Sequence, residues 1–277
     1  MSDFESLGII AGSKSLPLLI AREARASGIR KIVVAAFEGE TDSAIAQLAD
    51  KITWLRVGQL SRMISAFSDE GITRCVMAGQ IAPKNLFDLR PDLRAMALML
   101  RLKEKNAHSI FGGIAEELQK DGIDLIEATR WLKPSMPGEG FLIGRELNPE
   151  QQEDAHYGFR IAKEISRLEI GQCIVVKNGA VLAVEAFEGT NACLERGGLL
   201  AGKKGGAVAV KVAKENHDLR FDIPCIGNET VQICAKSGIK VLALEAGKTV
   251  LLEKTEVEQA ARQNGITIVT IGSHSAR

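Results

Sequence analysis

The chain has 277 residues, with 35 Lys and Arg against 35 Asp and Glu, so its formal net charge is zero. Hydrophobic residues make up 45% of the chain and charged residues 25%, which is the balance of a folded globular protein rather than a disordered one. At about 100–200 residues per domain, this length fits two modest domains or one large one. A neutral chain lacks the surplus of Lys and Arg with which a general nucleic-acid binder displaces counterions, so we expect no nucleic-acid partner.

The cysteines and the N-terminus bear on where the protein works. Five cysteines, widely spaced and without a Cys-x-x-Cys pair, argue against a disulfide framework or a zinc site of paired thiolates. The apolar run from Leu7 to Gly12 is too short for a signal peptide, and no apolar stretch approaches the roughly 18 residues of a membrane-spanning helix. We therefore expect a cytoplasmic protein, which would reach any lipid from the membrane surface.

Short apolar strands alternate with helices through the first half of the chain. We expect strands at 7–11, 31–37, 52–57 and 72–77, and helices at 15–27, 43–49, 59–69, 91–105 and 109–120. Strands separated by helices of this length build a parallel sheet that is covered on both faces. The pattern predicts a Rossmann-like first domain, although Gly-x-Gly-x-x-Gly is absent after its first strand and the dinucleotide fingerprint therefore fails.

The densest cluster of proline and glycine lies at 133–140, and we place the domain boundary there, with domains at 1–135 and 136–277. Asn148-Pro149 predicts the start of a helix that runs to about Leu168. Asn178-Gly179 is the strongest short signal for a β-hairpin. The further expected elements are strands at 172–177, 180–187, 207–212, 241–245, 249–253 and 266–271, and helices at 229–237 and 257–264. This pattern predicts a mixed α/β second domain with an antiparallel component.

A glycine-rich stretch at 197–206 contains a partial match to a phosphate-binding loop. Residues 197–204 fit Gly-x4-Gly-Lys, but Lys204 stands where a P-loop has Ser or Thr for magnesium, and a helical segment precedes the match where a P-loop has a strand. We therefore interpret 197–204 as a flexible basic loop, which could still approach a phosphate.

The most concentrated group of charged side chains lies at 217–224. If this segment is extended, Asp218, Arg220 and Asp222 share one face, because side chains in a strand alternate with a period of two. Carboxylates beside an arginine, with Lys211 at the end of the preceding strand, are suited to holding a divalent cation against a diphosphate. A solvated loop with internal salt bridges has the same composition, so the residues alone leave both interpretations open.

Several motifs occur in the order found in one protein family. They are Glu169-Ile-Gly-Gln172, Val184-Glu-Ala-Phe-Glu-Gly-Thr190, Val210-Lys211, Asp218-Leu-Arg-Phe-Asp-Ile-Pro224, Ile226-Gly227, Thr230 and Leu244-Glu-Ala-Gly247, preceded by Gly8-Ile-Ile-Ala-Gly12, Leu16-Pro17 and Ala78-Gly79-Gln80-Ile81. On these motifs essentially the whole chain resembles the LpxI family, the UDP-2,3-diacylglucosamine pyrophosphatases of lipid A synthesis. It departs from the family at Asn191, which stands where the family has Asp and is a weaker general base because it carries no charge.

The resemblance implies magnesium-dependent hydrolysis of the diphosphate of UDP-2,3-diacylglucosamine, which gives UMP and 2,3-diacylglucosamine 1-phosphate (lipid X). It also implies a homodimer with a Rossmann-like first domain and a distinct second domain. As to location, it implies an enzyme of the cytoplasm, either free or in peripheral contact with the inner membrane. The alternative is a non-catalytic protein that binds a nucleotide sugar or a lipid precursor.

The resemblance also assigns roles to residues. Asp222 and Asp218 become the catalytic carboxylates and the ligands of Mg²⁺. Lys211 and Arg220 neutralise charge on the phosphate oxygens, which is usually the main contribution in phosphoryl transfer. The predicted substrate-binding residues are Gly12, Ser13, Gly79, Gln80, Gln172, Glu188, Gly189, Thr190, Asn191, Lys211 and Arg220. The first four of them follow strands of the first domain, where a doubly wound sheet receives a nucleotide.

Overall fold

A computed structural model describes residues 4–81, 91–103, 107–214, 218–220 and 223–272. The chain forms two compact units. The first contains the described residues up to Leu132 and, in addition, Leu219 and Arg220. The second contains the described residues from Lys133 to Asp218 and from Ile223 onward. The predicted division into 1–135 and 136–277 treats each domain as one continuous segment and stays a prediction.

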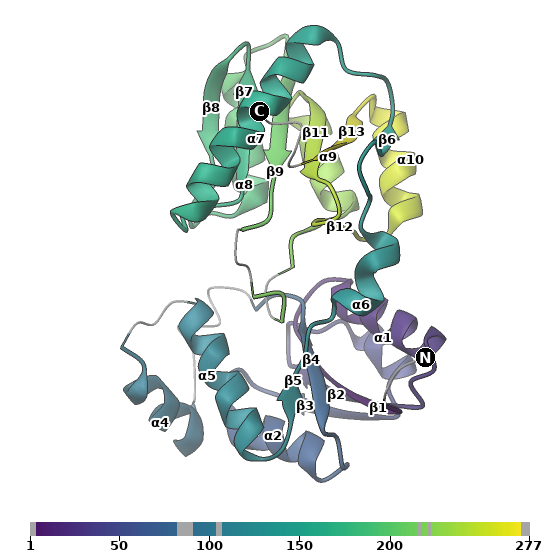
Figure 1. The fold of residues 1–277 in the computed structure, drawn as a ribbon, viewed down its shortest axis with the longest axis vertical. Helices are drawn as coiled ribbons and strands as arrows, with labels where there is room; N and C mark the ends of the chain where they lie inside the picture. Colours follow the sequence, from purple (N-terminus) through teal and green to yellow (C-terminus); the bar gives the residue numbers. More distant parts are fainter. Residues whose placement is uncertain (1–3, 82–90, 104–106, 215–217, 221–222, 273–277) are drawn as a thin grey trace. The chain divides into compact units, whose positions relative to one another are not determined.

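The first unit contains a five-stranded sheet in the order β3-β2-β1-β4-β5, in which all neighbouring strands are parallel (Figure 1). The strands are β1 (Ser6–Ala11), β2 (Lys31–Phe37), β3 (Lys51–Leu55), β4 (Arg74–Ala78) and β5 (Asp124–Leu125). The helices are α1 (Leu16–Ala26), the 3-10 helix η1 (Ser43–Gln47), α2 (Leu60–Ser68), α4 (Leu93–Arg101), α5 (Ala107–Lys120) and α6 (Thr129–Leu132). This strand order is that of a Rossmann-type half, with its topological switch between β1 and β4.

Burial explains why the central strands of this sheet are apolar on both faces. All residues of β2 after Lys31 are buried, and so are all residues of β1 after Ser6. One set of alternating side chains, including Val33 and Ala35, packs in a core cluster with Phe67 of α2 and Leu118 of α5. The prediction of a Rossmann-like parallel-sheet domain is therefore confirmed. The expected helix at 43–49 is a short 3-10 helix instead.

The second unit is built on a six-stranded mixed sheet in the order β6-β13-β11-β9-β7-β8 (Figure 1). Its strands are β6 (Leu142–Ile143), β7 (Cys173–Lys177), β8 (Ala180–Val184), β9 (Ala207–Lys211), β11 (Ile239–Glu245) and β13 (Thr267–Ile271), and a separate parallel pair is formed by β10 (Cys225–Ile226) and β12 (Val250–Leu251). Its helices are η2 (Lys133–Ser135), α7 (Pro149–Arg167), α8 (Thr190–Leu200), α9 (Asn228–Lys236) and α10 (Lys254–Asn264). β9, β11 and β13 are parallel, whereas β7 runs antiparallel to both β8 and β9.

Helices cover both faces of this second sheet. Phe159 and Ala162 of α7 pack against Val176, Val210 and other residues on one face. Residues of α8, α9 and α10, among them Leu194, pack in a cluster on the other face. The mixed α/β second domain with an antiparallel component is thus confirmed.

Two short sequence motifs form the local structures that were expected of them. Asn148 begins α7 with a capping box, in which its side chain accepts the Gln151 N–H and the Gln151 side chain accepts the Asn148 N–H. Asn178 and Gly179 both have positive φ angles, 51° and 73°, as the tight turn between β7 and β8 requires.

The glycine-rich stretch differs from the expectation. α8 continues to Leu200, so residues 197–200 are helical and the prediction of a flexible loop is wrong there. A Cβ atom on Gly197 would lie 2.5 Å from the Val175 Cβ, which is closer than carbon atoms pack. Gly197 therefore lets α8 approach β7 and has no role as a phosphate-binding loop.

Across the described residues, no helix is both long and apolar enough to span a bilayer.

Candidate functional site

Polar residues gather at one edge of the second sheet. Lys211 ends β9, and its neighbours in the ladder are Cys173, which begins β7, and Leu244, one residue before the end of β11. β8 ends at the same edge, because Val184 pairs with Ile174. We call this the Lys211 edge and define it by Gln172, Glu185, Lys211 and Glu245, each at or next to a strand end.

A chain of hydrogen bonds joins several predicted residues at the Lys211 edge. Lys211 Nζ donates to Thr190 Oγ1 and to the Cys225 carbonyl, both at 3.1 Å. Thr190 Oγ1 donates to Glu185 Oε1 at 2.9 Å, and Glu185 Oε2 accepts the Gln172 N–H at 3.2 Å. The structure therefore brings Gln172, Thr190 and Lys211 together through Glu185, a residue that was not among the predicted site residues.

The first turn of α8 contributes backbone donors beside the Lys211 ammonium. α8 begins at Thr190, and its N-cap residue, Gly189, has no side chain with which to bind the N–H groups of the first turn. Gly189 has φ 83°, a left-handed conformation that favours glycine. The first N–H groups of a helix have no partner within the helix and carry a partial positive charge. Together with Lys211, the α8 start is therefore suited to a phosphate group.

Two further predicted residues at α8 lie differently. Asn191 is half-buried in the first turn, next to Thr190. The Glu188 carboxylate pairs with Arg196, with 2.5 Å between Oε1 and the guanidinium, and it accepts the Ala186 N–H at 3.1 Å. The hydrogen bond from Arg196 lowers the pKa of Glu188. Glu188 therefore pairs with Arg196 of α8, and the carboxylate that contacts Thr190 is that of Glu185.

The predicted residues of the first unit meet at its topological switch. Ser13 and Gln80 form an isolated antiparallel bridge, in which the Ser13 N–H and Oγ donate to the Gln80 carbonyl at 2.7 and 2.8 Å. A Cβ atom on Gly12 would lie 2.6 Å from that carbonyl oxygen, and one on Gly79 would overlap the Ser13 carbonyl. Glycine at both positions therefore allows the loops after β1 and β4 to close on each other, and all four predicted residues lie at this point.

The structure describes only part of the segment at 217–224. Leu219 and Arg220 lie in a turn, so the extended conformation under which Asp218, Arg220 and Asp222 would share one face is not found at these two residues. Asp218 belongs to the second unit and Arg220 to the first. Arg220 lines a small pocket of about 220 Å³ in the first unit, together with Glu116, Gln119 and Asp124 among others. His217 and Asp222 lie outside the described residues.

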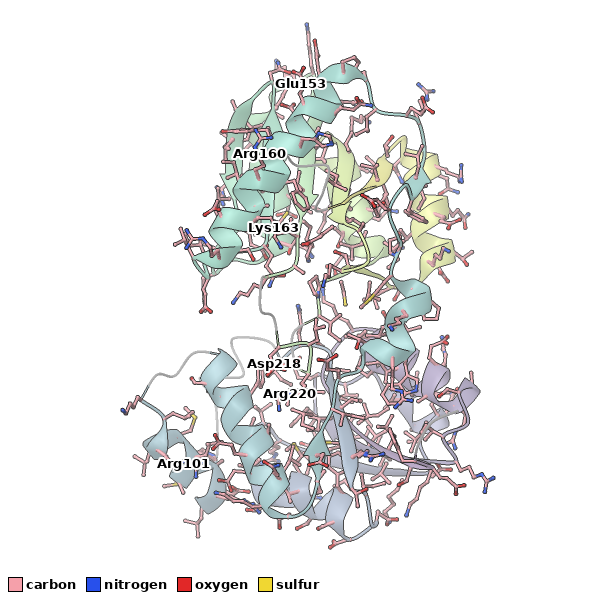
Figure 2. The ribbon with its side chains drawn as sticks, in the orientation of Figure 1. Arg101, Glu153, Arg160, Lys163, Asp218 and Arg220 are labelled. Carbon is pink, nitrogen blue, oxygen red and sulfur yellow. The ribbon has the colours of Figure 1, made fainter. Side chains whose placement is uncertain are left out.

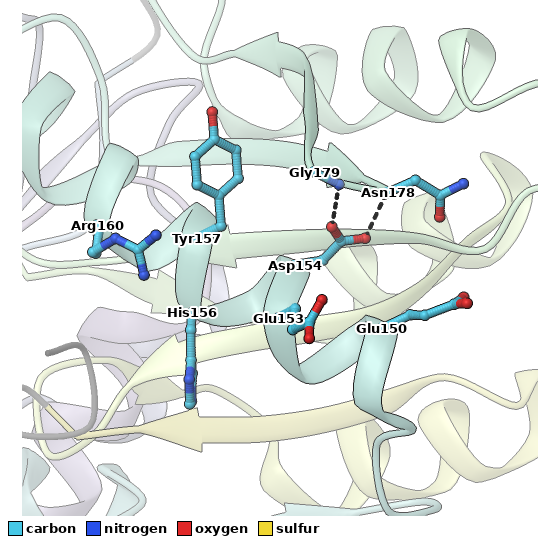
Figure 3. A pocket seen from close by; sticks show the side chains of 8 residues that line it. All are labelled: Glu150, Glu153, Asp154, His156, Tyr157, Arg160, Asn178 and Gly179. Carbon is cyan, nitrogen blue, oxygen red and sulfur yellow. Dashed lines mark hydrogen bonds between the residues drawn. The ribbon is translucent and has the colours of Figure 1, made fainter.

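A larger pocket, of about 530 Å³, lies at the opposite end of the second sheet (Figure 3). α7 and the β7–β8 turn line it, and none of the predicted site residues takes part. Asp154 accepts the N–H groups of Asn178 and Gly179 at 2.8 and 2.7 Å, as the dashed lines in Figure 3 mark. Because the Asp154 carboxylate is committed to the turn, we interpret it as a structural residue.

A thiol nucleophile finds no support near the Lys211 edge. A hydrogen bond with Cys193 and burial raise the pKa of the Cys173 thiol, so the thiol stays protonated and is a poor nucleophile. In the described part of the chain, no three His, Cys, Asp or Glu side chains are grouped as ligands for a metal ion.

Two family models match the chain nearly end to end. The LpxI N-terminal domain matches residues 6–134, and the LpxI C-terminal domain matches residues 138–269. The chain belongs to the LpxI family. The predicted resemblance is thereby confirmed, and family membership confirms that the chain is an enzyme of the pyrophosphatase class, a hydrolase.

Individual proteins add detail to the LpxI assignment. UDP-2,3-diacylglucosamine pyrophosphatase LpxI of Caulobacter vibrioides (strain ATCC 19089 / CIP 103742 / CB 15) is 29% identical over 276 residues, which cover 96% of this chain and 97% of that protein. The crystal structure of N5-carboxyaminoimidazole ribonucleotide synthetase from Thermotoga maritima matches 67% of this chain and 42% of its own length. Its sequence identity is 14% and its TM-score is 0.24, which is too weak a likeness to support an argument.

Proposed function

We propose that this LpxI chain hydrolyses the diphosphate of UDP-2,3-diacylglucosamine to UMP and 2,3-diacylglucosamine 1-phosphate, in lipid A synthesis. In this reaction water adds to one phosphorus, and the bond from that phosphorus to the bridging oxygen breaks. The similarity to the Caulobacter pyrophosphatase over nearly the full length of both chains supports this substrate. The observation that carries the proposal is the Lys211 ammonium beside the uncapped first turn of α8.

Charge explains how the Lys211 edge would act on a diphosphate. Negative charge accumulates on phosphate oxygens during phosphoryl transfer, and fixed positive groups that are already in place stabilise it. Lys211 supplies a full positive charge, and Glu185 orients it through the Thr190 hydroxyl. Gln172 and the first turn of α8 add hydrogen-bond donors to the same edge. We further propose that Gly12, Ser13, Gly79 and Gln80 contact the nucleotide.

The proposed function includes Mg²⁺, with Asp218 and Asp222 as its protein ligands. Carboxylate oxygens suit this ion, which is usually bound by one or two carboxylates and completed by substrate phosphates and water. A site of that kind does not need three protein ligands, so the donor chemistry of two aspartates fits it. Bound Mg²⁺ would supply charge stabilisation at the phosphate oxygens. Arg220 is proposed as a further cation for the phosphates, and a homodimer in the cytoplasm or at the inner-membrane surface completes the proposal.

The test is release of UMP from UDP-2,3-diacylglucosamine by the full chain, with Mg²⁺ and with a chelator. We expect release that requires the metal ion and that is lost in Asp222→Ala. Asp69→Ala, which removes an exposed carboxylate at the end of α2, is the matched control and should keep wild-type turnover.

Two results would contradict the proposal. A well-folded wild-type protein that binds the substrate without releasing UMP would favour the non-catalytic binding protein. Normal turnover in Asp222→Ala would remove Asp222 from the catalytic residues and leave the substrate assignment standing.

A further inference from the structure

We propose that the largely buried ion pair between Lys163 and Glu245 positions the chain that leaves β9, two residues after Lys211, and that turnover depends on it. Neither residue was among the predicted site residues. The effect of the pair on turnover rests on the proposed function, whereas its effect on the position of the backbone does not.

Most of the pair is buried in the second unit, although the Lys163 side chain is 18% exposed. Glu245 is the last residue of β11 and is 6% exposed. Lys163 projects from α7 (Figure 2), and its Nζ lies 3.2 and 3.3 Å from the two carboxylate oxygens of Glu245. The contact joins the helix on one face of the sheet to the end of a central strand.

Both side chains also bind the backbone of Ala213, two residues after Lys211. The Ala213 N–H donates to Glu245 Oε2 at 2.8 Å, and the Ala213 carbonyl accepts from Lys163 Nζ at 2.9 Å. The preceding N–H, of Val212, donates to the Gln172 carbonyl at 3.0 Å. Every backbone polar group of the buried Ala213 therefore has a partner, and the chain that leaves β9 is fixed there.

Residues at the Lys211 edge also bind the chain where it returns to the sheet. Lys211 Nζ donates to the Cys225 carbonyl, and the Pro224 carbonyl accepts the Val250 N–H at 2.8 Å. The chain that contains Asp218 therefore leaves the sheet at Ala213, which Lys163 and Glu245 bind. It returns at Cys225, which Lys211 binds. A shift of Ala213 would move both Lys211 and the chain that contains Asp218.

The attraction between the two charges does not by itself account for this pair. Burying two charges costs several kcal/mol in desolvation, and apolar residues of similar volume in place of a buried pair are often neutral or stabilising. An apolar pair could not bind the N–H and carbonyl of Ala213. A nearby pair on the same helix, Glu164 with Arg167 at 3.0 Å, is more than half exposed and forms no such link. Position, rather than stability, is what the buried pair provides.

The experiment compares Glu245→Gln and Lys163→Met with the wild type in the full chain. Because displacement of a reacting group by about 1 Å can cost about a hundredfold in rate, we expect kcat to fall by roughly ten- to a hundredfold, with KM changed by less than about threefold. Lys163→Arg should recover part of kcat. Glu164→Gln is the matched control on α7 and should keep wild-type kcat.

A double variant separates the pair's charge from its hydrogen bonds. The charge exchange K163E/E245K keeps an ion pair but places each group against the wrong backbone atom of Ala213. We expect it to remain impaired in kcat. Wild-type kcat in this variant would overturn the proposal, because neutralisation of charge would then suffice.

Hydrogen exchange gives a readout that needs no activity. Amides in peptides covering 207–214 should exchange faster in Glu245→Gln than in wild type, while those of the first unit should not change. Unchanged exchange and unchanged kcat would overturn the proposal, as would a lower melting temperature with unchanged kcat per folded molecule. If the wild type releases no UMP, the proposed function fails, and the exchange data alone decide whether the pair fixes the backbone.

Discussion

Replacing Lys211 with methionine removes the ammonium group and keeps the aliphatic part of the side chain. The structural loss is two hydrogen bonds of 3.1 Å, to Thr190 and to the Cys225 carbonyl. At about 1.5 kcal/mol for each bond from a charged donor, we expect a loss of about 3 kcal/mol in the free energy of unfolding. If the ammonium stabilises charge on the diphosphate, kcat should fall by about 100- to 1000-fold, as when one donor to a developing oxyanion is removed. We therefore expect the Lys211→Met variant to stay folded and to lose most of its turnover.

The control for this prediction is Lys177→Met. Lys177 ends β7 at the opposite edge of the same sheet, and its Nζ donates to the Ala201 carbonyl at 2.7 Å. It should lose about half as much stability, because it gives up one hydrogen bond instead of two, and it should keep its kcat. The assays are steady-state UMP release and urea unfolding of both variants. A kcat within threefold of wild type for Lys211→Met, or an equal loss of kcat in both variants, would refute the reasoning.

Two other predictions concern stability. Gly197→Ala should lower the free energy of unfolding by about 1–3 kcal/mol, because the new methyl group meets Val175, whereas Gly112→Ala, which meets nothing within 4 Å, should raise it by up to about 1 kcal/mol. Urea unfolding measures both, and equal shifts would contradict the packing argument. Hydrogen bonds from Lys120 and Arg94 lower the pKa of Glu117 from 4.5 to about 2. The ionised form therefore stabilises the fold above pH 4.5, and this contribution is lost as the pH falls toward 2, so the stability difference between wild type and Glu117→Gln should shrink over that range. A constant difference would contradict this.

The fold could be predicted well because local signals and burial agree. The β-branched run at 31–37 forms a buried strand, Asn148-Pro149 begins a helix, and Asn178-Gly179 makes a hairpin turn. The glycines at 197–198 were misinterpreted because glycine is both a loop residue and a residue of close packing. Only the contact between α8 and β7 distinguishes the two roles.

The site was predicted only in part, since the motifs indicate residue types and not partners. Thr190 and Lys211 do meet, but Glu185, which joins them to Gln172, was not among the predicted site residues, and the predicted strand at 180–187 included it. The strand ends at Val184 and frees Glu185 to turn toward Thr190. The pairing of Lys163 with Glu245 leaves no sequence signal at all, because 82 residues separate the two.

The return of Leu219 and Arg220 to the first unit bears on how the protein is made. During synthesis the ribosome completes residues up to Leu132 long before it reaches this turn, so the earlier unit emerges without the part of its surface that Arg220 later supplies. A fragment cut after Leu132 would stay in that unfinished state permanently. Cotranslational folding should accordingly proceed in two stages, with the first unit gaining its last contacts only after β9 of the second has left the ribosome.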